Sequence, residues 1–188
     1  MSGENVKTIV LKLALLGDAG VGKTSLINMY TEQHFREDYK PTLGVSITVK
    51  EIELENVNTQ IRLVLWDIAG QDRYDLSRKM FFQGVFGALL IYDTTRHSTF
   101  QNIEAKWLKD LKEYGEIDSA YILIGNKIDL KDSRIISPEK GKELANKLEA
   151  TDFIETSAKY GENVEEAFKR LVERVSKNQG IELDPNNS

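Results

Sequence analysis

Gly17-Asp18-Ala19-Gly20-Val21-Gly22-Lys23-Thr24 is the stretch that decides the fold of this chain. It fits the pattern G-x-x-x-x-G-K-[ST] and lies between the apolar run Ile9–Leu16 and a segment with helical spacing. Its glycines permit backbone angles that other residues avoid, so successive N–H groups can converge on phosphate oxygens. The Lys23 ammonium can reach the β- and γ-phosphates of a nucleotide, and the Thr24 hydroxyl suits Mg²⁺. The stretch therefore predicts a phosphate-binding loop at the start of a helix.

Apolar runs alternate with helix-period segments on both sides of this loop. We expect strands near Val6–Leu16, Val45–Leu54, Gln60–Asp67, Gly87–Asp93, Ala120–Asn126 and Asp152–Glu155. We expect helices near Gly22–Thr31, Asp72–Phe82, Ser98–Tyr114, Pro138–Leu148 and Glu162–Lys177, with Ser98 and Ser137 at two of the helix starts. This alternation is typical of an α/β protein whose mainly parallel sheet carries helices on both faces. The short connection of residues 55–59 suits a hairpin, so we expect one antiparallel edge strand.

Length and composition indicate one globular domain. The chain has 188 residues, of which 40% are hydrophobic and 29% charged, and domains average about 150 residues. We assign residues 1–177 to this domain and expect residues 178–188, which hold few apolar side chains, to form a disordered tail. The chain has 25 basic and 30 acidic residues, which gives a net charge of −5. This negative charge argues against a nucleic-acid partner.

The chain contains no cysteine. This excludes a disulfide framework, a thiolate metal site, a cysteine nucleophile and lipid attachment through cysteine. The apolar runs Ile9–Leu16 and Val85–Tyr92 are far shorter than the roughly 18 residues of a membrane-spanning helix. We therefore expect a cytoplasmic monomer that has no membrane anchor of its own and associates with membranes only through partners or a missing tail.

A second motif, Asn126-Lys127-Ile128-Asp129, follows the expected fifth strand, where an open parallel sheet binds ligands. An ionised Asp129 only accepts hydrogen bonds, so it suits the N1–H and N2 amino donors of guanine, whereas adenine presents an acceptor there. Sites built around such a bond reject a ligand that lacks it by about 10⁴-fold. After the sixth strand, the backbone N–H groups of Ser157-Ala158-Lys159 can meet the guanine carbonyl. Together with the phosphate loop, these segments favour a guanine nucleotide.

These segments together resemble the small GTPases of the Ras superfamily, over nearly all of Lys7 to Lys177. The likeness is strongest to the Rab branch, through Gly17–Thr24, Pro41-Thr42-Leu43-Gly44-Val45 and Trp66-Asp67-Ile68-Ala69-Gly70-Gln71-Asp72-Arg73-Tyr74. The resemblance implies a three-layer P-loop NTPase fold with a six-stranded sheet and five helices. It also implies a molecular switch that binds GTP or GDP with Mg²⁺ and hydrolyses GTP.

Individual roles follow from the same resemblance. Thr42 is similar to the switch threonine that touches both Mg²⁺ and the γ-phosphate, and Asp67 to the carboxylate that holds Mg²⁺ through water. Gly70 resembles the backbone donor to the γ-phosphate, and Gln71 the glutamine that orients the attacking water.

Three sets of site residues result. The nucleotide set is Gly17, Asp18, Ala19, Gly20, Val21, Gly22, Lys23, Thr24, Ser25, Phe35, Thr42, Gly70, Asn126, Lys127, Asp129, Ser157, Ala158 and Lys159, in which Phe35 and Lys127 would pack on the base. The metal set is Thr24, Thr42 and Asp67, and the catalytic set is Gln71, Lys23 and Thr42.

The resemblance also implies partner proteins. Hydrolysis by positioning and charge neutralisation is accelerated by an arginine, and no arginine directly precedes Thr42. We therefore expect slow intrinsic hydrolysis and a GTPase-activating protein that supplies an arginine, besides an exchange factor and effectors. Trp66, Phe81 and Ile47 fall where the Rab branch carries an apolar trio for effectors, although Ile47 replaces the phenylalanine usual there. Rab relatives also normally end in prenylated cysteines, which this sequence lacks.

Two other functions stay open from the residues. A nucleotide-locked interaction module would bind GTP or GDP and scarcely hydrolyse it, which Gln71 and Thr42 disfavour. A P-loop ATPase or kinase is disfavoured by Asn126 and Asp129.

Overall fold

The computed structural model describes residues 7–35, 42–53, 59–70, 80–116, 118–181 and 183. Its centre is a six-stranded sheet with the strand order β2-β3-β1-β4-β5-β6. The strands are β1 (Lys7–Leu16), β2 (Val45–Glu53), β3 (Thr59–Ile68), β4 (Gly87–Asp93), β5 (Ala120–Asn126) and β6 (Asp152–Thr156). All neighbouring strands are parallel except β2 and β3, which are antiparallel, so β2 is the antiparallel edge strand. The predicted sheet is confirmed.

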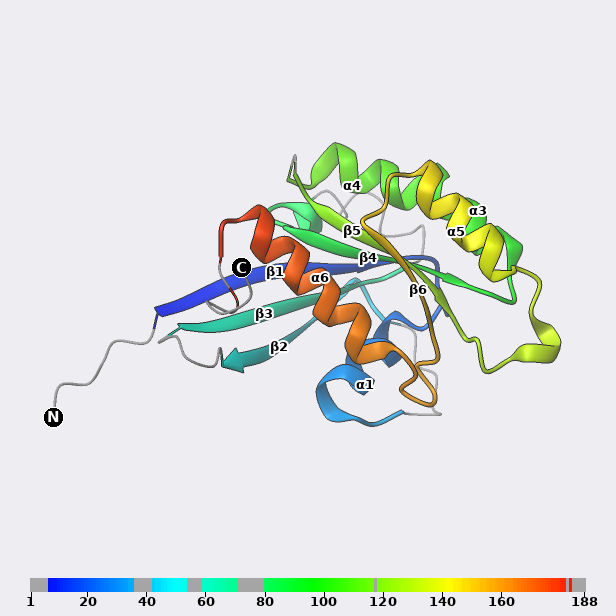
Figure 1. Cartoon of the computed structure of the whole chain (residues 1–188), viewed down its shortest axis with the longest axis horizontal. Helices are drawn as coiled ribbons and strands as arrows, with labels where there is room; N and C mark the ends of the chain where they lie inside the picture. The colour runs from blue at the N-terminus through cyan, green and yellow to red at the C-terminus, as the bar shows by residue number, and fades with distance from the viewer. Residues whose placement is uncertain are drawn as a thin grey trace, which may run out of the picture.

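Helices cover both faces of the sheet (Figure 1). They are α1 (Lys23–Glu32), α3 (His97–Asn102), the π-helical turn η2 (Ile103–Leu108), α4 (Lys109–Tyr114), the 3₁₀ turn η3 (Lys131–Ser133), α5 (Pro138–Lys147) and α6 (Val164–Asn178). In Figure 1, α1 and α6 lie on one face and α3, α4 and α5 on the other. The molecule is thus a three-layer α/β protein with the predicted P-loop NTPase architecture.

Two apolar clusters hold these layers together. Leu11, Leu13 and Leu15 point from β1 toward α1 and α6, whereas Ala14 and Leu16 point to the opposite layer. This alternation follows from the two-residue period of a strand. Because parallel strands are covered on both faces, β4 is buried along its whole length.

The apolar stripe of α6 packs on the sheet as its spacing predicts. Its buried side chains include Val164, Ala167, Phe168, Leu171, Val172 and Val175. Part of the predicted tail packs on the domain, because Ile181 and Leu183 contact the same apolar cluster. Residues 182 and 184–188 of the predicted tail lie outside the described part.

Helix starts agree with the sequence in one case and differ in another. Pro138 is the first residue of α5, and the Ser137 hydroxyl accepts from the Lys140 N–H at 3.4 Å, as predicted. The Ser98 start is wrong, since α3 begins at His97 and its preceding residue, Arg96, makes no side-chain cap. The helical run to Tyr114 is also interrupted by the π-turn η2, which the apolar spacing does not reveal.

The predicted helix Asp72–Phe82 is described only at residues 80–82, which are helical. Within the described ranges, no helix combines the length and apolar character needed to cross a bilayer.

Candidate nucleotide-binding site

The phosphate loop, residues 17–22, leaves the carboxyl end of β1. The connection after β1 leads to β2 and β3 on one side of that strand, whereas the connection after β3 leads to β4 on its other side. Ligands of open α/β sheets bind at such a switch point, outside the carboxyl ends of the strands. The motifs after β3, β5 and β6 end at the same edge, which brings the predicted site residues together.

Backbone conformation shapes the loop before α1. Gly20 and Gly22 have φ angles of +73° and +105°, a region that side chains other than glycine rarely adopt. At Gly22 a Cβ atom would also lie 2.3 Å from the Asn126 amide nitrogen. The loop therefore needs glycine at residue 22 both for its conformation and for its contact with Asn126 at the end of β5.

The Lys23 side chain is buried inside the loop, with 6% of its surface exposed. Its ammonium donates to the carbonyls of Gly17 at 2.7 Å and Asp18 at 2.9 Å. Burial lowers the pKa of Lys23 to about 8, although the nearby carboxylates of Asp67 and Asp18 act in the opposite direction. A desolvated ammonium gains most from a bound anion, so this environment suits a phosphate.

Three oxygen-bearing side chains meet beside Lys23. The hydroxyls of Thr24 and Thr42 lie 3.1 Å apart, and both donate to the same carboxylate oxygen of Asp67. The other oxygen, Asp67 Oδ1, is buried and has no hydrogen-bond partner among the residues that the structure describes. Hydroxyl and carboxylate oxygens are the ligands that Mg²⁺ prefers, so the predicted metal set is assembled and fits this ion.

The base motif joins two loops of the site. Asn126 donates to the Val21 carbonyl at 2.8 Å, and its own carbonyl accepts from the Thr156 hydroxyl and the Ala158 N–H. Asp129 accepts from the Ser157 hydroxyl at 2.7 Å. Asn126 thus ties the phosphate loop to the segment after β6, while Asp129 lies beside Ser157.

Asp93, at the end of β4, is a member of the site that the sequence analysis missed. It is 1% exposed and lies 2.7 Å from the Lys127 ammonium and 2.9 Å from Arg96 Nε. Arg96 in turn donates through Nη2 to the Ala19 carbonyl at 3.0 Å. The carboxylate therefore links the base motif to the phosphate loop. Its place at the carboxyl end of a parallel strand was the one available signal.

Asp18 is in the predicted set, but its side chain turns away from the loop. Its two carboxylate oxygens accept from Asn102 Nδ2 at 2.7 Å and from Trp107 Nε1 at 2.8 Å. Nothing in their sequence spacing indicated these two donors, because they lie more than 80 residues further along the chain.

The other predicted residues fall at the edges of this site. A Cβ at Gly70 would lie 2.3 Å from the Ala19 nitrogen, so Gly70 rests directly on the phosphate loop. Phe35 and Ser25 are half-buried and Lys159 is exposed. Gln71, from the predicted catalytic set, lies outside the described residues.

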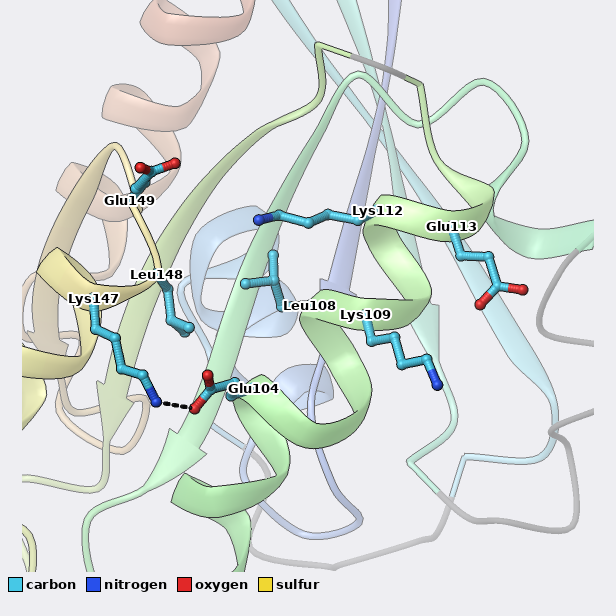
Figure 2. Close-up of a pocket in the computed structure, with 8 residues that line it drawn as sticks. All are labelled: Glu104, Leu108, Lys109, Lys112, Glu113, Lys147, Leu148 and Glu149. Atoms are coloured by element: carbon cyan, nitrogen blue, oxygen red, sulfur yellow. Dashed lines mark hydrogen bonds and ion pairs between the residues drawn. The ribbon is translucent and has the colours of Figure 1, made fainter.

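The predicted apolar trio gathers on the neighbouring face of the sheet. Ile47 of β2 pairs with Trp66 of β3, and the Phe81 ring centre lies 6.2 Å from that of Trp66. Ile47 is 50% exposed and the two aromatic side chains are half-buried. A surface groove between η2 and the end of α5, where Glu104 pairs with Lys147, lies apart from the site and contains none of its residues (Figure 2).

The fold and the loop define a P-loop nucleotide-binding protein. A model of the Ras family matches residues 12–177. The chain is 41% identical over 177 residues to the Ras-related protein RABA6b of Arabidopsis thaliana, covering 93% of this chain and 76% of that one. It is 39% identical over 166 residues to the Ras-related protein RGP2 of Oryza sativa subsp. japonica, covering 88% of this chain and 75% of that one. The chain therefore belongs to the Ras family, with Rab-related proteins among its relatives, and is a small GTPase.

Proposed function

We propose that this chain is a switch that binds GTP or GDP with Mg²⁺, hydrolyses GTP slowly and acts in the cytoplasm in Rab-like membrane trafficking or signalling. The observation that carries the proposal is the meeting of two separate segments on the phosphate loop. Thr42, ahead of β2, contacts Thr24 and Asp67, and Gly70, after β3, rests on Ala19. A γ-phosphate bound at this place would contact both segments, and its loss on hydrolysis would remove those contacts.

The chain's own groups account for binding. The Lys23 ammonium and the N–H groups of residues 17–24 would hold the phosphates, and Asp129 would accept from the guanine N1–H and N2 amino groups. Thr24, Thr42 and Asp67 would hold Mg²⁺, which supplies charge neutralisation at the phosphates. The unpartnered Asp67 Oδ1 supports this placement.

Hydrolysis needs a positioned water and a neutralised transition state. Gln71 is the residue proposed to orient the water. Arg96 is close to the phosphate loop, but its guanidinium is bound to Asp93 and to the Ala19 carbonyl. The arginine that accelerates hydrolysis therefore comes, in our proposal, from a GTPase-activating protein, with an exchange factor and effectors as further partners.

Effectors are proposed to bind over the trio Ile47, Trp66 and Phe81. This surface supports the proposal because it is partly exposed and apolar, and because Ile47 and Trp66 lie between Thr42 and Gly70 along the chain. A change in either segment would thus alter the surface that a partner meets.

One experiment tests the assignment directly. Nucleotide released from the purified protein is identified by chromatography, with and without chelation of Mg²⁺ during purification. We expect guanine nucleotide whose retention depends on Mg²⁺. Adenine nucleotide, or retention that ignores chelation, would contradict the proposal.

A single-turnover assay separates the switch from a nucleotide-locked module. Protein loaded with GTP is followed by phosphate release, and the same assay is run on Gln71→Leu. We expect slow release by the wild-type chain, at least about tenfold slower release by the variant and acceleration by an added activating protein. Fast hydrolysis by the isolated chain argues against the arginine proposal, and no release at all favours the locked module.

A further inference from the structure

The π-helical turn η2 lies where α3 passes the phosphate loop. Residues five apart in an α-helix point about 140° away from each other, because each residue turns by about 100°. A π-turn winds more widely, with its hydrogen bonds between residues five apart, and so brings such residues nearer to one side. Asn102, just before η2, and Trp107 within it are spaced in this way. The wider turn lets both side chains reach one target.

That target is the Asp18 carboxylate. Asn102 Nδ2 donates to one oxygen at 2.7 Å, and Trp107 Nε1 donates to the other at 2.8 Å. The indole is fully buried, and its N–H can only donate, while an ionised carboxylate only accepts. Hydrogen bonds to a charged acceptor are stronger than neutral ones. Asp18 is thereby fixed by two donors of complementary chemistry.

Further donors hold the same short stretch of backbone. The Lys23 ammonium donates to the carbonyls of Gly17 and Asp18. Arg96, the residue before α3, donates to the Ala19 carbonyl. The N–H and C=O of a trans peptide point in opposite directions, so holding the carbonyls also fixes the N–H groups. The orientation of the loop is therefore set by side chains from outside it as well as by its glycines.

We propose that Asn102 and Trp107 are positioning residues of the nucleotide site. Through the Asp18 carboxylate, η2 holds the phosphate loop in the conformation that binds the β-phosphate. Neither residue touches the nucleotide. This inference rests on the proposed function, since it requires nucleotide phosphates within residues 17–24.

The decisive variant is Trp107→Phe, which keeps an aromatic ring in the core and replaces the indole, with its N–H, by a smaller ring without a donor. We expect the dissociation rate of tritiated GDP, measured by filter binding in excess Mg²⁺, to rise about tenfold, the effect of one lost bond to a charged group. Asp18→Ala changes the same contact from the loop side, because it removes both acceptor oxygens, whereas an asparagine there could be satisfied by rotation of the Asn102 amide. It should raise the rate similarly and serves if Trp107→Phe does not fold.

Two further measurements separate positioning from packing. In the double variant Trp107→Phe/Asp18→Ala the effects should fall well short of multiplying, because both changes remove the hydrogen bond between Trp107 and Asp18. Competition at equilibrium should show GDP affinity falling about tenfold and GMP affinity by less than about twofold, because GMP lacks the β-phosphate. A side chain that only fills space would weaken both nucleotides alike or leave both unchanged.

Glu104→Gln is the matched control on the same turn. The Glu104 side chain pairs with Lys147 at 2.6 Å across the surface groove and belongs to the outer side of η2 (Figure 2). Its GDP dissociation rate should equal that of the wild type. An unchanged rate in both Trp107→Phe and Asp18→Ala, or equal losses for GDP and GMP, overturns the inference while leaving the proposed function intact. A wild-type chain that retains no guanine nucleotide overturns the proposed function, and this inference with it.

Discussion

At the scale of single residues, two side chains of the base motif have different roles. The Asn126 side chain makes its hydrogen bonds within the protein, to Val21, Thr156 and Ala158. Asp129 accepts a hydrogen bond from the Ser157 hydroxyl through one carboxylate oxygen, Oδ1. Base selectivity should therefore follow Asp129, whereas substitution of Asn126 should loosen the phosphate loop.

Asp129→Asn tests that division. The amide presents a donor where guanine needs an acceptor, so we expect GDP affinity to fall by about 10²–10⁴-fold. Xanthine nucleotides carry a carbonyl in place of the guanine amino group, and their affinity should rise in the variant. Equilibrium competition with guanine and xanthine nucleotides measures this change in base preference. Equal loss of both affinities would show that Asp129 supports the loop and does not read the base.

Gly70→Ala tests the close approach between the segment after β3 and the phosphate loop. The added Cβ would lie 2.3 Å from both the Ala19 nitrogen and the Asp18 carbonyl carbon, which are backbone atoms and cannot rotate away. The segment must then withdraw, so we expect the affinity for a non-hydrolysable GTP analogue to fall at least about tenfold more than that for GDP. Parallel titrations with the two nucleotides measure the difference, and equal losses would contradict it.

Residues inside the motifs were predictable because each motif is a short, continuous stretch of sequence whose residue types indicate its chemistry. The loop Gly17–Thr24 and the tetrad Asn126–Asp129 are contiguous, so the sequence alone placed them at strand ends. Asp93, Asn102 and Trp107 were not, because their roles depend on which distant segments the sheet order brings together.

At the scale of elements, the end of β4 connects the two halves of the site. Burial alone would raise the pKa of Asp93, but hydrogen bonds from Lys127 and Thr95 outweigh it and hold the pKa below the ordinary value. The folded protein therefore binds this proton less tightly than the unfolded chain does. Such a group stabilises the fold above the unfolded pKa of about 4 and loses its contribution as the pH falls through the lower folded pKa.

Asp93→Asn should accordingly lower the free energy of unfolding by about 2 kcal/mol at neutral pH, since it leaves Lys127 and Arg96 without their charged partner. The difference from wild type should stay constant from about pH 7 to 5 and shrink below about pH 4. Urea titrations at several pH values measure it. Glu51→Gln, which breaks an exposed pair with Arg62 on the same sheet, is the control and should change stability by less than about 1 kcal/mol.

Elements were predictable to within a few residues where periodicity was strong, as in β4, β5 and α5. The run from His97 to Tyr114 shows the limit. Its apolar spacing reads as one helix, and the extra residue of a π-turn leaves that pattern almost unchanged. In the structure, Asn102 and Trp107 both donate to Asp18 where the wider turn occurs.

At the scale of the whole molecule, ligand binding and folding are linked. The site joins segments that follow β1, β3, β4, β5 and β6, so a nucleotide that bridges them binds the folded chain and not the unfolded one. At about 1,000 times its Kd a ligand adds about 4 kcal/mol.

We therefore expect the unfolding midpoint of nucleotide-free protein to rise by about 10 °C with saturating GDP and Mg²⁺, at about 2–4 °C per kcal/mol for a chain of this size. Differential scanning calorimetry measures the midpoint. ADP at the same concentration is the control and should leave it unchanged, and an equal rise with ADP would refute guanine selectivity.

The two tryptophans occupy contrasting surroundings. Trp107 is fully buried with its indole N–H on Asp18, whereas Trp66 is half-buried beneath the Lys12 ammonium, 3.6 Å from the ring centre. Indole emission shifts to longer wavelength with polarity, so the two should emit at different wavelengths and be quenched unequally by iodide. The chain thus carries two intrinsic optical probes, one at the phosphate loop and one on the proposed effector surface, with which loading and partner docking can be timed separately on unlabelled protein.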